Sequence, residues 1–267
     1  MRTSSWPKVS MLVLVCWCIL AASLASAADK KELIKQARAA QYNLTTRGFS
    51  GAQCNIAPNW ELVLQEQRKS DPSTFDAAIR ILNQIQFGVS VSSTGVAKTT
   101  HNSVSATNSQ VSQGLDQIYS GMEQMISGFF QTWSTFVVSY PFPEVESNYE
   151  LKEEASEYRL SYKEGTADVV TTMTKDLTIN EAKVTTPQFT SSIRPQFTRG
   201  AQGLLLTSYH ADYEEGSVGS TVRLDVHLTY QEVNGMQFPH VLDLSGSYGN
   251  VPFQMEVTLG GCQMSKR

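Results

Sequence analysis

The second half of the sequence consists mainly of short segments in which apolar and polar residues alternate. In 222–230, the clearest of them, every second residue is apolar: Val222, Leu224, Val226, Leu228 and Tyr230. Further alternating segments are 158–162 and 253–259, and Asn234-Gly235 is a strong hairpin signal. Because successive side chains of a strand point to opposite faces, this pattern predicts antiparallel strands with one apolar and one water-facing side.

The number of such segments limits the shape of the sheet. The segments 49–56, 87–91 and 96–101 add three strands ahead of the second half. We expect roughly nine to eleven strands, too many for a flat open sheet, so the sheet should curl into a barrel or half-barrel. Pro187 and Pro195 should mark loops or sheet edges, because proline cannot donate a hydrogen bond to a neighbouring strand.

Helical patterns lie mostly in the first half of the chain. Residues 29–44 carry apolar residues at three- and four-residue spacing, and Asp71-Pro72 is a typical helix start with a capping residue before proline. Asn43-Leu44-Thr45 matches a glycosylation acceptor, but it falls inside the first predicted helix and is discounted. Helices followed by strands, without an internal repeat, predict an α+β fold in which helices cover a large curved antiparallel sheet.

The longest helical pattern covers residues 111–133. Gly114, Gly121 and Gly128 recur within it every seven residues. Each glycine disfavours a helix by about 1 kcal/mol relative to alanine, so three of them need a structural reason. We expect them to let another backbone approach the helix closely.

The first 27 residues have the pattern of a secretory signal peptide. Arg2 and Lys8 form a basic start, 11–20 is an apolar run, and Ala25-Ser26-Ala27 is a small-x-small cleavage site. The apolar run is shorter than the roughly 20 residues that a membrane span needs. We therefore expect cleavage near Ala27, a single domain over 28–267, no stable transmembrane segment after cleavage, and a periplasmic or secreted protein.

Charge and composition exclude several classes of protein. Without residues 1–27, which hold two basic and no acidic side chains, 240 residues remain with 19 basic and 25 acidic ones. This net negative charge of −6 argues against nucleic acid as a partner, because such proteins cluster Lys and Arg against phosphates. A hydrophobic content of 41% also argues against a disordered chain.

Two cysteines, Cys54 and Cys262, remain after the predicted cleavage. An even count in an oxidising compartment predicts one disulfide between the start and the end of the fold. The chain-entropy model gives about 5 kcal/mol as an upper bound for the stabilisation by so long a loop. Two unpaired buried thiols are the alternative.

The sequence offers no convincing catalytic site. Its four histidines are far apart, and none has the i, i+4 spacing of a helical zinc motif. Asp225 and His227 share a strand face, which is more simply a solvated surface. No nucleophile elbow, phosphate-binding loop or dinucleotide fingerprint is present. We therefore expect a protein that is not an enzyme and that uses no cofactor and no metal.

The positive feature is an apolar surplus on the long helix and on the cleanest strand. Flexible and aromatic side chains on the helix suit an acyl chain, because methionine adapts to irregular apolar shapes. Barrels of this size can enclose a ligand in a cavity lined mainly by hydrophobic side chains. The candidate lipid cavity and lid residues are Leu115, Ile118, Met122, Met125, Ile126, Phe129, Phe130, Trp133, Val222, Leu224, Val226 and Leu228. Ordinary core packing is the alternative for each.

The order of elements resembles the superfamily of the periplasmic outer-membrane lipoprotein carrier, LolA. An export signal, an amphipathic helix ending in Tyr42-Asn43-Leu44, a strand, inserted helices and a long meander follow one another, and the segments 159–162 and 235–239 are similar to those of lipoprotein-sorting-like proteins. The resemblance implies an unclosed half-barrel around a hydrophobic cavity with a helical lid. A helical insertion near 59–140, the Cys54–Cys262 link and the lack of a matching lid arginine depart from the carrier.

Three functional hypotheses follow. The leading one is an exported soluble carrier that binds lipid or lipoprotein acyl chains in an apolar cavity and exchanges them with envelope donor and acceptor proteins. The alternative is a non-catalytic envelope interaction or scaffold protein with a filled core. The third is an exported enzyme with dispersed residues such as Asp225 and His227.

Overall fold

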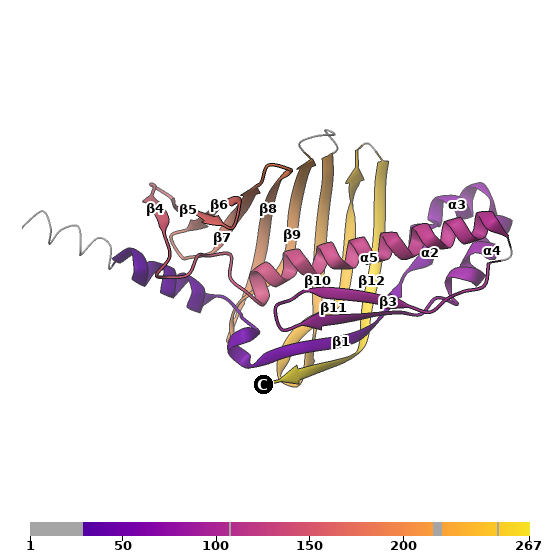
Figure 1. Cartoon of the computed structure of the whole chain (residues 1–267), viewed down its shortest axis with the longest axis horizontal. Coiled ribbons are helices and arrows are strands. Elements are labelled where there is room, and N and C mark those ends of the chain that lie inside the picture. Colours follow the sequence, from indigo (N-terminus) through magenta and orange to yellow (C-terminus); the bar gives the residue numbers. More distant parts are fainter. Residues whose placement is uncertain (1–28, 107, 216–220, 250) are drawn as a thin grey trace, which may run out of the picture.

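The computed structural model describes residues 29–106, 108–215, 221–249 and 251–267, and the predicted signal peptide and its cleavage site lie outside them. Twelve antiparallel strands form one open sheet, and a long helix crosses its inner face (Figure 1). The sheet order is β3-β2-β1-β12-β11-β10-β9-β8-β7-β6-β5-β4, so β3 and β4 are its two edges. The predicted α+β fold with an unclosed half-barrel is confirmed.

The strands follow the predicted segments, but the sheet has twelve strands rather than the roughly nine to eleven expected. Their bounds are β1 Phe49–Pro58, β2 Phe87–Ser92, β3 Ala97–His101, β4 Tyr149–Glu153, β5 Glu157–Glu164, β6 Ala167–Thr174, β7 Ile179–Thr185, β8 Phe189–Gly200, β9 Gly203–Glu215, β10 Thr221–Val233, β11 Met236–Tyr248 and β12 Val251–Lys266. The helical elements are η1 Thr45–Arg47, α2 Trp60–Val63, α3 Gln65–Ser70, α4 Pro72–Leu82 and α5 Ser109–Val137. Asp71 caps α4 as predicted, since its side chain accepts a hydrogen bond from the backbone N–H of Thr74.

The first helix ends four residues earlier than predicted, at residue 40. Tertiary hydrogen bonds take over from there: the N–H of Tyr42 donates to Leu204 and that of Leu44 to Val137. Asn43 is buried, and its side-chain amide donates to the carbonyls of Val138 and Ser139. Asn43 is therefore a poor glycosylation site because it is buried, and not because it lies in a helix as predicted.

Pro195 departs from its expected place in a loop or at a sheet edge, because it lies inside β8 and pairs with Tyr209 of β9. The pairing of β7 with β8 ends at Ile193, so nothing on that side requires a hydrogen bond from residue 195. Leu177 lies in the turn before β7 and has a positive φ of 66°.

The expected close approach at the three glycines of α5 is wrong. A Cβ placed on Gly114, Gly121 or Gly128 would meet no heavy atom within 4 Å. These glycines border open space. The tight glycine contact of this helix comes from Gly95 in the β2–β3 turn, where a Cβ would lie 2.2 Å from that of Ser134.

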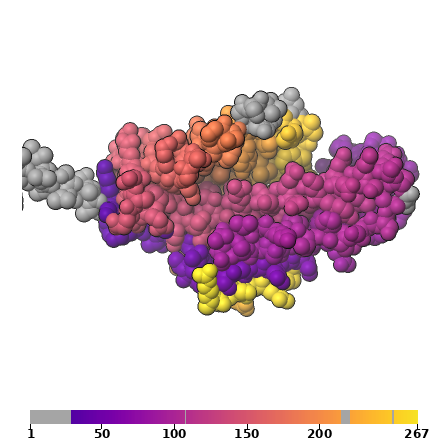
Figure 2. Space-filling view, viewed as in Figure 1, coloured from indigo at the N-terminus to yellow at the C-terminus, as the bar shows by residue number. Residues whose placement is uncertain are grey.

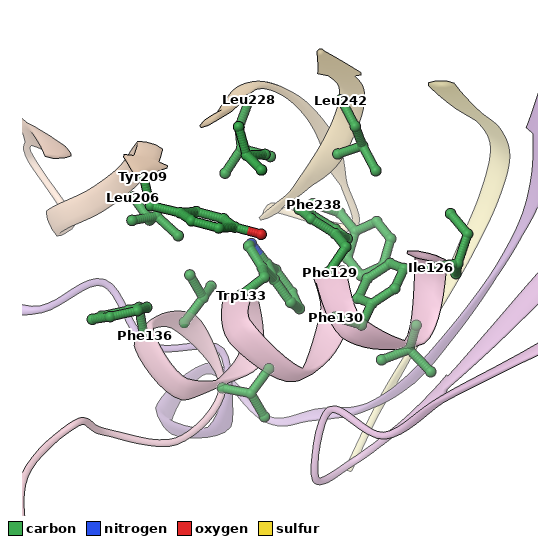
Figure 3. Packing of buried hydrophobic residues seen from close by; sticks show 14 of the residues in the cluster. Ile126, Phe129, Phe130, Trp133, Phe136, Leu206, Tyr209, Leu228, Phe238 and Leu242 are labelled. Carbon is green, nitrogen blue, oxygen red and sulfur yellow. The ribbon is translucent and has the colours of Figure 1, made fainter. Parts of the chain in front are cut away.

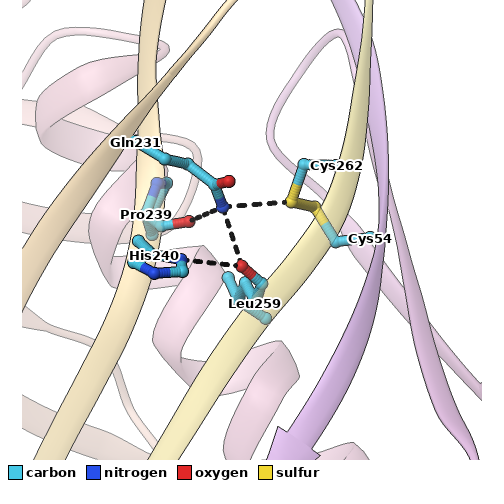
Figure 4. The surroundings of a disulfide bond; sticks show 6 residues. All are labelled: Cys54, Gln231, Pro239, His240, Leu259 and Cys262. Carbon is cyan, nitrogen blue, oxygen red and sulfur yellow. Dashed lines mark hydrogen bonds between the residues drawn. A yellow bond between two sulfur atoms is a disulfide. The ribbon is translucent and has the colours of Figure 1, made fainter.

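The predicted disulfide is present between Cys54 of β1 and Cys262 of β12, and it joins residues 208 positions apart (Figure 4). It lies at an irregularity in the β1–β12 pairing between Gln53 and Asn55. The side-chain amide of Gln231 donates to the carbonyls of Pro239 and Leu259 beside it. The disulfide thus links β12 to the first strand of the fold, and Gln231 of β10 connects β11 and β12 beside it.

Candidate functional site

Most of the predicted lipid-cavity residues are packed in a filled interior. Eight side chains from α5 and β10 are nearly or fully buried: Leu115, Met122, Ile126, Phe129, Phe130, Trp133, Val226 and Leu228. Figure 3 shows the aromatic rings of α5 lying against Phe238 and leucines of the sheet. The ring centroids of Trp133 and Phe238 are 5.5 Å apart. This half of the inner face is a closed core.

The remaining four predicted residues are only partly buried: Ile118, Met125, Val222 and Leu224. Two lie on α5 and two near the start of β10. The structure therefore divides the predicted set into a core group and a group at the margin of the core.

The marginal residues of α5 lie on one flank of that helix. A spacing of four and three residues places Gly114, Ile118, Gly121, Met125, Gly128 and Thr132 in a single stripe. The Thr132 hydroxyl lies 3.1 Å from that of Tyr213, near the end of β9. Phe130, on the other flank, stacks on Phe238 at the start of β11. We refer to the stripe that contains the three glycines as the glycine flank. It therefore faces the half of the sheet formed by the end of β9 and the start of β10.

That half of the sheet extends beyond α5. Figure 1 shows the upper ends of β8 to β12 standing above the helix, and Figure 2 shows the same orange and yellow strands rising behind the ridge that α5 forms. The inward-facing side chains of β10, β11 and β12 there are Val222, Leu224, Tyr248, Val251, Phe253 and Met255. We refer to these six residues as the open face.

The open face becomes more exposed row by row along the strands. The row Val226–Leu244–Met255 borders the core, and Leu224–Gly246–Phe253 follows it. Phe253 is 38% exposed. In the outermost row Tyr248 is 62% exposed and Val251 is 69% exposed. Apolar alternation thus continues past the point where the helix stops covering it.

Sequence reasoning missed four residues of this face: Tyr248, Val251, Phe253 and Met255. The signal was available, because Phe253 and Met255 belong to the alternating pattern of the last strand. Gly246 lies between Leu224 and Phe253 and leaves a gap in the apolar surface. A Cβ there would lie 2.0 Å from the carbonyl oxygen of Arg223, so this position is restricted to glycine.

A group of hydroxyls lies where α5 meets the open face. Tyr209 and Tyr213 of β9 pair with Val226 and Val222, so they occupy the first buried row and the outermost row. The Tyr209 hydroxyl is buried and has no hydrogen-bond partner among the described residues. Burial raises the pKa of Tyr209 well above its ordinary value, and nearby Tyr213 raises it further. The Thr132 hydroxyl is close enough to oppose this shift in pKa, but its hydrogen bond is made to Tyr213. The phenol is therefore neutral near pH 7 and can donate a hydrogen bond.

A cleft of different character lies at the carboxyl end of α5. It has a volume of about 740 Å³ and is lined by Arg38, Asn43, Tyr140, Phe142, Tyr162 and Lys163 together with hydroxyl side chains. Arg38 lies over the Tyr140 ring at 4.3 Å and donates to the carbonyl of Pro143. Burial raises the pKa of Tyr162 to about 12. The lining of this cleft mixes charged, hydroxyl and aromatic side chains, in contrast to the open face.

The strand face that carries Asp225 and His227 points away from α5. The Asp225 carboxylate lies 2.7 Å from Nδ1 of His210, and Nε2 of the same imidazole lies 3.3 Å from the Asp212 carboxylate. Arg194 also binds Asp212. Burial raises the pKa of Asp212, but the hydrogen bonds and charges of Arg194 and His210 outweigh it and lower that pKa. Asp225 therefore works with His210 in a surface charge network, and His227 is exposed beside it.

Within the described ranges, no helix has the length and apolar character to cross a membrane, and no group of three potential ligand side chains could hold a metal ion. Comparison with known proteins adds nothing further: no family model, curated protein or solved structure matches this chain. The fold and the site define an open α+β half-barrel whose inner face is partly core and partly bare apolar surface.

Proposed function

We propose that this protein is an exported carrier that binds an acyl chain of a lipid or lipoprotein on the open face, beside the glycine flank of α5. The observation that carries the proposal is the run of apolar side chains from Met255 to Val251 on the inner face of the sheet. Six large apolar side chains are exposed among the described residues, and Tyr248, Val251 and Phe253 are three of them. An exposed group of apolar side chains of this kind is typical of binding sites.

An acyl chain fits this surface better than a folded partner does. The open face is bounded on one side by α5, and Gly121 and Gly128 leave space along that boundary. Met125 is a flexible neighbour that adapts to a slender apolar ligand. Each methylene of such a ligand that leaves water contributes about 0.8 kcal/mol, so a chain binds without covalent chemistry.

The disulfide supports export, because such bonds persist in oxidising compartments. A periplasmic or secreted location, the signal peptide at 1–27 and the likeness to the LolA superfamily are parts of the same proposal. Donor and acceptor proteins of the envelope would supply and receive the ligand.

The experiment is a matched pair of charge substitutions. Val251 and Val96 are almost equally exposed, but Val96 lies in the β2–β3 turn away from the open face. We expect Val251→Asp to weaken the binding of a fluorescent fatty acid about tenfold, a loss of about 1.4 kcal/mol. Val96→Asp should leave binding unchanged. Equal binding by both variants and the unsubstituted protein would exclude the open face as the site.

The filled core favours a second candidate, a non-catalytic envelope interaction or scaffold protein. Trp133, Phe129 and Phe130 leave no room for a ligand beneath α5, and the cleft near Tyr162 would then receive a partner protein. Native mass spectrometry separates the candidates. A mass excess that organic extraction removes supports the carrier, and a bare protein that also fails to bind added fatty acid supports the scaffold.

A further inference from the structure

A buried hydroxyl without a partner lies at the inner end of the open face. Tyr209 is 2% exposed, and its hydroxyl forms no hydrogen bond with any described residue. Two neighbouring hydroxyls are engaged elsewhere: Thr132 with Tyr213, and Tyr230 with Trp133 and the carbonyl of Leu206. A buried polar group that stays unpaired destabilises the folded protein, so its retention calls for an explanation.

The position of Tyr209 suggests what pairs with it. Tyr209 shares a row of the sheet with Val226, Leu244 and Met255, the row at which the open face passes into the core. Figure 3 shows its side chain reaching across from β9 towards α5 and Trp133. A ligand that lies along the open face with its end against α5 would bring that end to this hydroxyl.

We propose that Tyr209 donates a hydrogen bond to the carbonyl oxygen of the bound acyl ligand. This inference rests on the function proposed above and deepens it, because it assigns the ligand class: an acyl chain with an ester, amide or carboxyl carbonyl at its inner end, rather than a plain hydrocarbon. The neutral phenol is a donor, and a carbonyl oxygen accepts without bringing a proton of its own. A folded partner cannot reach a side chain so deeply buried, whereas a slender chain can after Tyr213 moves.

Space for this entry exists on the helix side. Gly128 precedes Thr132 by one helical turn and bears no side chain, and a Cβ there would meet nothing within 4 Å. Tyr213 is only partly buried and is held by its contact with the Thr132 hydroxyl. Exchange of that contact for one with the ligand would open the path to Tyr209.

The test combines two ligands with two variants of the full protein. Methyl myristate and myristyl methyl ether differ only in the carbonyl oxygen, and each is measured by its displacement of bound 1-anilinonaphthalene-8-sulfonate. We expect the unsubstituted protein to bind the ester about threefold to tenfold more tightly, the ratio expected of one net hydrogen bond. Tyr209→Phe should remove this preference and leave ether binding unchanged.

Stability separates a ligand contact from a structural role. Tyr209→Phe removes an unpaired buried hydroxyl, so its melting temperature without ligand should equal or exceed that of the unsubstituted protein. Tyr230→Phe is the control, since it breaks hydrogen bonds with Trp133 and Leu206 and should melt lower while keeping the ester preference. An ester preference that survives in Tyr209→Phe, or that is absent from the unsubstituted protein, overturns this inference alone. Failure of both ligands to bind the unsubstituted protein overturns the proposed function with it.

Discussion

The two halves of the inner sheet face have the same alternating sequence pattern but different surroundings. In the row Leu228–Leu242–Val257 all three side chains are buried against the aromatic residues of α5. Three rows further along the same strands, Tyr248 and Val251 are mostly exposed. Apolar alternation therefore marks one face of the sheet but does not tell how far α5 covers that face.

The largest expected effect contrasts one aromatic residue from each half. Trp133→Ala should lower the free energy of unfolding by about 3–5 kcal/mol, because it leaves a cavity in the closed core. Phe253→Ala should lower it by less than about 1 kcal/mol, because a partly exposed side chain leaves no cavity. Urea denaturation of both variants checks this, and equal losses would show that the open face is covered in solution.

Removal of the disulfide should affect stability but not the open face. The double variant Cys54→Ser, Cys262→Ser should lose about 2–5 kcal/mol, because the unfolded chain is no longer constrained by a long loop. Fatty acid binding measured at a temperature where the variant stays folded should match that of the unsubstituted protein. Weaker binding under those conditions would mean that the link also holds the open face in shape.

A substitution in the glycine flank should increase stability rather than reduce it. Gly121→Ala should raise the free energy of unfolding by about 1 kcal/mol, because alanine favours a helix and its Cβ meets nothing. Gly246→Ala is the control within the open face and should destabilise, since its Cβ would collide with Arg223. A destabilised Gly121→Ala variant, by thermal melting, would restore the close-approach interpretation of the glycines.

The smallest expected effect on stability concerns the face of the sheet that points away from α5. The pKa of Asp212 in the folded protein is lowered, so its interactions with Arg194 and His210 stabilise the protein above the unfolded-state pKa of about 3.9. This contribution is lost as pH falls through the folded-state value. Asp212→Asn should therefore cost about 0.5 kcal/mol at neutral pH, because the group is partly exposed, and nothing in strong acid. A constant difference across an acid titration of stability would contradict this assignment.

The sequence predicts the strands well because alternation is a local property. It fixes which face of 222–230 is apolar, but not where along that segment α5 crosses, which depends on contacts such as Thr132 with Tyr213. For the same reason Trp133 and Val222 could not be separated into core and margin. The glycines were misassigned because a stripe of small residues has the same spacing whether it faces a backbone or open space.

The end of the first helix illustrates the same limit. Residues 41–44 continue the helical spacing, yet distant partners, Leu204 and Val137, take their backbone hydrogen bonds. Tyr209 was not predicted at all, because nothing in 204–209 distinguishes a tyrosine with a partner from one without. Such a residue is recognised only once its surroundings are known.

The central claim is that an acyl chain lies on the open face, and photo-crosslinking tests it most directly. The protein is incubated with a fatty acid that carries a diazirine at its tail, irradiated, digested and sequenced by mass spectrometry. We predict labels in 118–125 of α5, at Tyr248 of β11 and in 251–255 of β12, lost on competition with unlabelled fatty acid. Labels confined to the cleft around Tyr140 and Tyr162, or spread evenly over the chain, would contradict it.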